Sequence, residues 1–201
     1  MLDAARPGPA ASPAVRLAEA LRDLADLAVG SSAPDAVLDD VAAELVRLRQ
    51  VLAPHARPTR FEQAERIGTV GTFVNHPMVG SANPCAPPIV MRPDGERLTG
   101  DVQFGTAREG PPGCAYGGYI AAGFDAILLM AAGMNGVGGP TRRLEVRYLR
   151  PTPLNTPLRY ESAIASVEER VTRITGRLLA GDVVCAEGVA EVARGRRVRI
   201  D

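Results

Sequence analysis

Apolar residues recur every three or four positions in two stretches near the N-terminus, residues 15–29 and 35–53. This spacing predicts two helices. The second stretch carries leucine and valine alternately three and four positions apart, which places them in a stripe along one helix face. The members of this stripe are Leu38, Val41, Leu45, Leu48 and Leu52. Glycine and serine separate the two stretches, so we expect a helical hairpin that packs on another part of the protein.

The pattern changes in the second half of the chain. Short apolar runs at 89–92 and 98–105 predict two strands, and an uninterrupted apolar run at 118–132 predicts a helix. Four further strand-like runs, joined by short turns, follow at 143–150, 157–167, 171–180 and 183–193. Because this single helix is apolar on all sides, it has to be buried, and the sheet is the element that can cover it. The predicted fold class is α+β, one curved antiparallel sheet wrapped around one long helix, with a tail and helical hairpin over 1–60 and the sheet domain over 61–201.

Composition and charge narrow the function classes. The chain has 201 residues, 46% of them hydrophobic, and 23 basic side chains balance 23 acidic ones. A neutral chain argues against nucleic acid or an anionic membrane as the main partner. The hairpin, residues 15–53, contains four arginines and seven acidic residues, a net charge of −3. That charge is wrong for a DNA-binding helix pair.

The cysteines, histidines and termini suggest a reduced compartment. Three cysteines are widely separated and there are only two histidines, so we expect no metal site. The N-terminus has no cationic start followed by an apolar run, so no secretory signal is predicted. The most apolar run, residues 119–134, is short for a bilayer and contains Asp125. We expect a soluble cytoplasmic protein with no membrane partner.

The loop at residues 109–118, EGPPGCAYGG, leads directly into the apolar helix. Glycines at a helix start let the backbone approach a ligand, and the N–H groups there stabilise partial negative charge, as an oxyanion site requires. Asp125 follows Gly118 by seven residues, almost two turns, so both lie on one helix face. A carboxyl group among apolar neighbours is costly to ionise, which suits a general base. The other interpretation is a carboxylate that caps or bonds a neighbouring backbone group.

The turn Tyr116-Gly117-Gly118, together with Asp125 and the later segment LEVRYLRP at 144–151, resembles the hot-dog-fold acyl-CoA thioesterases of the phenylacetate-pathway type. In that family a His-Gly-Gly turn leads into the central helix, and an acid follows the histidine by nine residues. Tyr116 and Asp125 have the same spacing. The resemblance covers roughly residues 85–193 and implies a hot-dog fold for the sheet domain.

The resemblance also implies catalytic roles. Asp125 would activate water or attack the thioester carbonyl directly, and the Gly118 N–H would polarise the carbonyl oxygen. Thr141, at the start of the next strand, falls where the family places a hydroxyl that holds the water. Asp125, Gly118 and Thr141 are therefore the candidate catalytic residues of a thioester hydrolase.

Four further residues are candidates for substrate binding. Tyr116 replaces the family's histidine, Gly117 would assist at the carbonyl, Phe124 would border an acyl channel, and Arg150 could reach the phosphates of coenzyme A. The implied substrate is acyl-CoA or another acyl thioester, with coenzyme A entering only as part of it and no separate cofactor. The family's sites form across a dimer interface, so we expect a homodimer or dimer of dimers. The alternative is a non-catalytic acyl-CoA binding or sensing protein, because tyrosine does not titrate near neutrality as histidine does.

Overall fold

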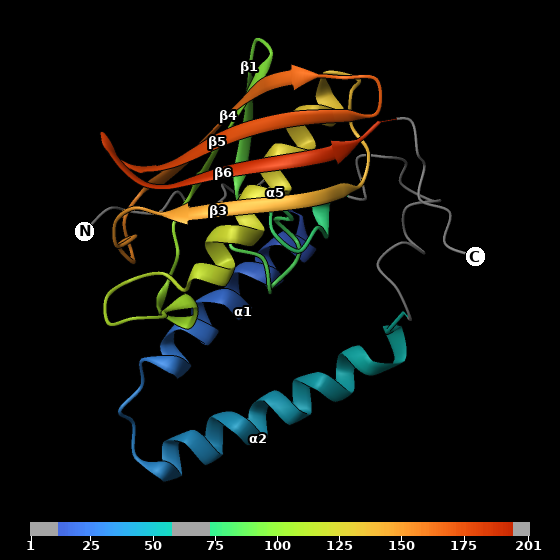
Figure 1. Ribbon diagram of the computed structural model, residues 1–201. Helices are drawn as coiled ribbons and strands as arrows, with labels where there is room; N and C mark the ends of the chain where they lie inside the picture. The colour runs from blue at the N-terminus through green and yellow to red at the C-terminus, as the bar shows by residue number, and fades with distance from the viewer. Residues whose placement is uncertain (1–11, 58–72, 195–201) are drawn as a thin grey trace.

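The protein consists of one curved antiparallel sheet around a long helix, with two helices attached at the N-terminal side (Figure 1). The computed structural model describes residues 12–57 and 73–194. The six strands lie in the order β1-β2-β4-β5-β6-β3. In chain order the elements of this unit are β1 Val90–Asp94, β2 Arg97–Val102, α5 Gly117–Met134, β3 Thr141–Tyr148, β4 Leu158–Val167, β5 Val171–Ala180 and β6 Val183–Ala193. The predicted α+β class and the predicted order of elements are confirmed.

Alternating residues of the central strands face the helix. On β5 the helix-facing positions Thr172, Ile174 and Leu178 are fully buried, whereas Arg173 and Arg177 between them are exposed. This period of two is what a sheet with one covered face requires. The second strand is shorter than the run 98–105 predicts, because the chain leaves the sheet after β2 and forms the short 3-10 helix η3, Thr106–Arg108.

Helix α5 lies in the concave side of the sheet, which explains its apolar sequence. Phe124, Ile127 and Leu128 have no exposed surface. Two glycines paired across β5 and β6, Gly176 and Gly188, let the sheet approach the helix closely. A Cβ atom on Gly188 would lie 2.5 Å from Cδ1 of Phe124. By length and composition alone this 18-residue helix could cross a membrane, contrary to the sequence expectation, but the core helix of a sheet domain has the same character.

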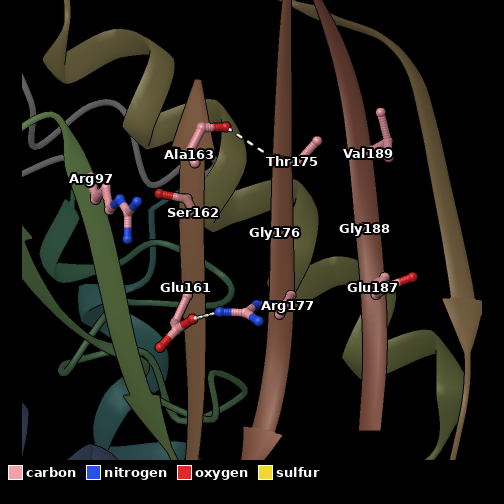
Figure 2. A pocket seen from close by; sticks show the side chains of 10 residues that line it. All are labelled: Arg97, Glu161, Ser162, Ala163, Thr175, Gly176, Arg177, Glu187, Gly188 and Val189. Carbon is pink, nitrogen blue, oxygen red and sulfur yellow. Dashed lines mark hydrogen bonds and ion pairs between the residues drawn. The ribbon is translucent and has the colours of Figure 1, made fainter. Parts of the chain in front are cut away.

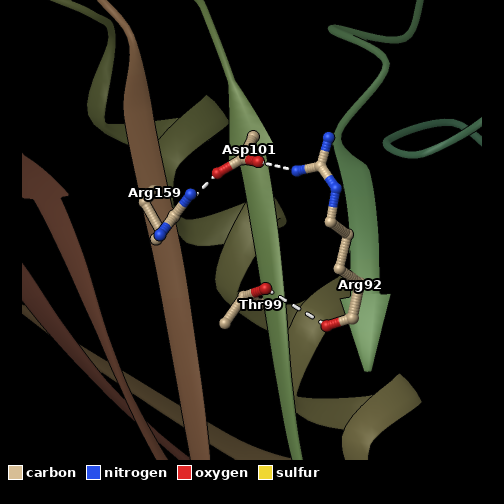
Figure 3. A network of polar contacts seen from close by, with 4 residues as sticks. All are labelled: Arg92, Thr99, Asp101 and Arg159. Carbon is tan, nitrogen blue, oxygen red and sulfur yellow. Dashed lines mark hydrogen bonds and ion pairs between the residues drawn. The ribbon is translucent and has the colours of Figure 1, made fainter. Parts of the chain in front are cut away.

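Charged side chains join the strands on the outer face of the sheet. Asp101 on β2 lies between Arg92 on β1 and Arg159 on β4 and forms an ion pair with each (Figure 3). The Arg159 Nε–Asp101 Oδ1 distance is 2.8 Å, and Thr99 donates a hydrogen bond to the Arg92 carbonyl oxygen at 3.1 Å. Because these groups are largely exposed, each pair adds little stability. The two ion pairs link three neighbouring strands across the outer face of the sheet.

The two N-terminal helices behave differently from each other. Helix α1, Pro13–Val29, packs against the segment that precedes the sheet and against η3. Arg22, only 8% exposed, donates to the carbonyl oxygens of Ser81 and Asn83, the latter at 2.8 Å. Helix α2, Asp35–Leu52, has no buried residue and runs away from α1 (Figure 1). A short 3-10 helix, η1 (Ala53–His55), follows it.

The predicted hairpin is therefore open, since only its first helix is packed on the sheet domain. The predicted division at residue 60 lies in 58–72, outside the described residues.

Replacing Asp26 with alanine is expected to weaken the attachment of α1. The Asp26 carboxylate accepts a hydrogen bond from the Ala107 N–H at 2.7 Å, and removing it leaves that part-buried donor unpaired. The expected loss in free energy of unfolding is about 1–3 kcal/mol, measured by urea denaturation. Asp23→Ala is the matched control, an exposed acid in the same helix, and is expected to stay within about 0.5 kcal/mol of wild type. Equal effects of the two substitutions would contradict the role given to Asp26.

Candidate functional site

The start of helix α5 carries free backbone donors. Tyr116 is the N-cap residue in an extended conformation, and its own N–H donates to the Arg108 carbonyl oxygen at 2.9 Å. The preceding residue is held as well, since the Ala115 N–H donates to the Thr152 carbonyl oxygen at 2.8 Å. Within the described part of the chain, neither the Gly117 nor the Gly118 N–H has a hydrogen-bond partner. These two amides at the positive end of the helix can stabilise an oxyanion.

Tyr148 fixes this helix start from β3. Its hydroxyl donates to the Gly117 carbonyl oxygen at 2.8 Å, and a Cβ atom on Gly117 would lie 3.2 Å from its ring. Sequence reasoning used Tyr148 only as part of a motif and missed this contact. The alternation of Leu144, Val146 and Tyr148 along β3 could have indicated it, because these three share the helix-facing side.

Asp125 is the only charged residue of α5. Its carboxylate is half-buried, and its Oδ1 accepts a hydrogen bond from the Thr141 hydroxyl at 2.9 Å. Thr141 is the first residue of β3, so the fold brings together two candidate catalytic residues that lie 16 positions apart. Among the described residues, Asp125 has neither an ion-pair partner nor a backbone donor. Its partner is thus a side-chain hydroxyl, rather than the backbone group that the structural interpretation of this acid required.

Gly118 and Asp125 share a face of α5 but are not adjacent. Seven residues of α-helix rise about 10 Å along the axis. A carbonyl group bound at the Gly118 N–H is therefore out of direct contact with the carboxylate of the same chain. Each chain therefore presents two free amide donors and an acid at separate points of one helix.

Tyr116 and Arg150 lie at the surface near the helix start. Tyr116 is 57% exposed, and its ring lies over Gly118, where an added Cβ atom would be 2.5 Å from Cε1 of the tyrosine. It also contacts Tyr119 edge to face, with ring centroids 6.5 Å apart. Arg150 follows β3, its side chain is exposed, and it makes no ion pair with any residue in 12–57 or 73–194. Both side chains are free to meet a ligand from solution.

Phe124 lies elsewhere, inside the closed core. It is fully buried between helix and sheet and contacts Tyr160 edge to face, with ring centroids 5.1 Å apart. Leu128, one turn further along α5, is also fully buried. In the single chain this space is therefore filled by side chains, and Phe124 acts as a packing residue.

Arg108 connects the N-terminal helix to the candidate site, which sequence reasoning did not foresee. This arginine is 7% exposed, its Nη1 lies 3.9 Å from Oδ1 of Asp26, and its guanidinium lies 5.7 Å from the centre of the Tyr119 ring. The Arg108 carbonyl oxygen accepts a hydrogen bond from the Tyr116 N–H. A buried guanidinium over an aromatic ring supports the loop rigidly. No local sequence pattern could have shown a contact that joins residues this far apart.

A separate hollow of about 390 Å³ lies on the outer face of the sheet (Figure 2). It is bordered by Arg97 and by the ion pair of Glu161 and Arg177, whose Oε2 and Nη2 are 2.8 Å apart. None of the candidate catalytic or substrate-binding residues lines it. Within the described ranges, no group of three or more His, Cys, Asp or Glu residues could hold a metal ion.

Comparison with known proteins agrees with this architecture. No family model matches the sequence. A crystal structure of a thioesterase superfamily protein matches with 29% identity over 92% of this chain and 92% of its own, with a TM-score of 0.81. The match has to include most of the N-terminal helices, since it covers nine-tenths of the chain. The chain therefore has the hot-dog fold and is similar to that thioesterase superfamily protein over nearly its whole length.

Two shorter proteins share the fold at lower identity. One, from Ralstonia eutropha JMP134, is related to phenylacetic acid degradation; it is 20% identical, covers 67% of this chain and 99% of its own, and has a TM-score of 0.51. The other, from Streptococcus mutans UA159, was solved bound to acetyl CoA; it is 16% identical, covers 55% and 91%, and has a TM-score of 0.50.

Proposed function

We propose that this protein hydrolyses acyl-CoA or a similar acyl thioester. The observation that carries the proposal is Asp125, a half-buried carboxylate in an otherwise uncharged helix, hydrogen-bonded at 2.9 Å by Thr141. A lone acid held by a hydroxyl, on a helix whose first amides are free, has the parts that acyl transfer needs. The related Streptococcus mutans structure, bound to acetyl CoA, supports coenzyme A as the thiol part of the substrate.

The reaction requires one water molecule and no cofactor beyond the coenzyme A of the substrate. The Asp125 carboxylate accepts a proton as the water oxygen bonds to the thioester carbonyl carbon, and the negative charge moves to the carbonyl oxygen. The Gly118 N–H, aided by that of Gly117, stabilises this oxyanion. Collapse breaks the carbon–sulfur bond, and the proton held by Asp125 passes to the departing thiolate. In the alternative mechanism, the Asp125 carboxylate itself attacks the thioester carbonyl carbon and displaces the thiolate. Water then hydrolyses the resulting anhydride.

Two chains are expected to form each site. Direct attack needs a carboxylate in contact with the carbonyl carbon, and Asp125 lies about 10 Å along the helix from the Gly118 of its own chain. Strand β3 is an edge strand that pairs only with β6 among the described strands, so its other edge is available to a second copy. A homodimer joined at β3 would bring the Asp125 of one chain to the Gly118 of the other.

Exposed side chains around the helix start would hold the rest of the substrate. Arg150 is a free guanidinium suited to a phosphate of coenzyme A. Tyr116 would contact the thioester region, since its ring lies over Gly118. Phe124 stays in the core, so the acyl group would bind where two chains meet.

The test is thiol release from a panel of short, medium, long and aromatic acyl-CoAs, together with binding of each compound by calorimetry. Turnover with at least one class, at a rate proportional to enzyme concentration, is expected. Binding without turnover across the panel would overturn the hydrolase proposal. It would favour a non-catalytic acyl-CoA binding or sensing protein in which the Tyr116 ring covers the oxyanion donors.

A further inference from the structure

Helix α2 carries a stripe of exposed apolar side chains. Leu38, Val41, Leu45, Leu48 and Leu52 are between 38% and 50% exposed, although they lie on one face at positions three and four apart. No residue in the described part of the chain buries any of them. A contiguous apolar patch of this size on a protein surface marks an interaction site.

The stripe borders an apolar groove between the two N-terminal helices. The helices diverge from the turn that joins them (Figure 1). Between them lies a groove of about 800 Å³, lined by Leu17 and Leu21 of α1 and by Leu45, Leu48 and Leu52 of α2. Two divergent helices with apolar facing sides fit a further amphipathic helix.

The charges along α2 indicate which helix fits. The acidic residues of α2, Asp35, Asp39, Asp40 and Glu44, all precede its two basic residues, Arg47 and Arg49, in the chain. A second α2 in the antiparallel direction would place basic residues beside acidic ones, and a parallel copy would place like charges together. The net charge of −2 on the helix does not suit an anionic membrane.

We propose that α2 of a second copy of this chain occupies the groove in the antiparallel direction. In the register that matches the stripes, Leu38 lies opposite Leu48 of the second copy and Val41 lies opposite Leu45. Asp35 then flanks Arg49 of the second copy. Glu44 meets its own counterpart, but it already forms an ion pair with Arg47 in the same helix. The contact is symmetric, so both grooves are filled at once.

This surface is separate from the proposed active site. The groove belongs to the N-terminal helices, whereas Gly118, Asp125 and the free edge of β3 belong to the sheet domain. The proposal therefore stands or falls independently of thioester hydrolysis.

Disulfide cross-linking of the full-length protein tests the proposal and its direction. In a background with Cys85→Ser and Cys114→Ser, one variant carries Leu38→Cys, a second carries Leu48→Cys, and a third carries both. Positions 38 and 48 lie about 15 Å apart on one helix, too far for a disulfide within the chain. After mild oxidation, most of the double variant is expected to migrate as a covalent dimer on a non-reducing gel. Each single variant is expected to remain a single chain.

Mixing the two single variants gives a second readout, a covalent dimer from up to about half of the chains, since an antiparallel contact pairs position 38 only with 48. Efficient cross-linking of either single variant alone would show a parallel pair and overturn the proposal. No cross-link in the double variant would also overturn it and would indicate that a different partner covers the stripe. Thiol release from acyl-CoA, measured on the same samples, shows separately whether hydrolysis is present.

Discussion

Asp125→Asn is expected to lower kcat for thioester hydrolysis by about 100- to 10,000-fold, the range that a general base contributes. Asparagine has nearly the same shape, and its amide oxygen can still accept the hydrogen bond that Thr141 donates at 2.9 Å. It cannot take a proton from water. The dissociation constant for acyl-CoA is therefore expected to stay within about threefold of wild type, because the substitution removes chemistry and leaves binding.

The measurement is steady-state thiol release beside calorimetric binding, with Asp182→Asn as the control. Asp182 is an exposed acid in the turn between β5 and β6, so its substitution makes the same change of charge outside helix α5. The control is expected to keep wild-type kcat. If Asp125→Asn keeps more than about a tenth of wild-type kcat, another group removes the proton and the mechanism proposed above is wrong.

Phe124→Ala is expected to reduce the free energy of unfolding by about 3–5 kcal/mol, as deletion of a fully buried aromatic ring does. The ring fills the space that Gly188 leaves open in the sheet and contacts Tyr160 edge to face. The Tyr160 hydroxyl donates to the Ile120 carbonyl oxygen at 3.1 Å, and burial raises its pKa well above the usual value. Loss of the neighbouring ring leaves a cavity beside this buried hydrogen bond.

Urea denaturation measures this loss, and Phe73→Ala serves as the matched control. Phe73 is 46% exposed, so the same deletion there is expected to change stability by no more than about 0.5 kcal/mol. A small loss of stability in Phe124→Ala, combined with a changed preference for acyl chain length, would instead support the predicted role of Phe124 beside an acyl channel.

The helix and the strands of the sheet domain could be predicted from the sequence because each kind of element has its own pattern of apolar residues. The run that became α5 is apolar on every side, and strands such as β5 alternate between buried and exposed residues. Strand order could not be read in this way. β3 follows the helix in the chain but pairs with β6, the last strand, because pairing depends on contacts between distant segments.

The same distinction applies to the candidate site, where relations within one helix could be predicted from the sequence and contacts between separate elements could not. Gly118 and Asp125 are seven residues apart on one helix, so helical geometry alone placed them on one face. The family resemblance points to Thr141 as a hydroxyl that holds the water, but it does not predict the hydrogen bond to Asp125, since the loop between the two residues has no periodic pattern. The contacts of Tyr148 with Gly117 and of Arg108 with Asp26 join separate elements, and no local pattern encodes them. The stripe on α2 predicted a buried face without indicating what would bury it.

The position of α5 in the chain has a consequence for biosynthesis. When this helix leaves the ribosome, β1 and β2 are the only strands of the described sheet that have been made, and β3 to β6 are still to follow. Synthesis proceeds at about 5–20 residues per second, so this long apolar helix stays without the strands that cover it for several seconds. The nascent chain is most exposed to aggregation and to capture by chaperones or membranes in that interval. Asp125, the one charge on the helix, is then an obstacle to mistaken insertion as well as a candidate base.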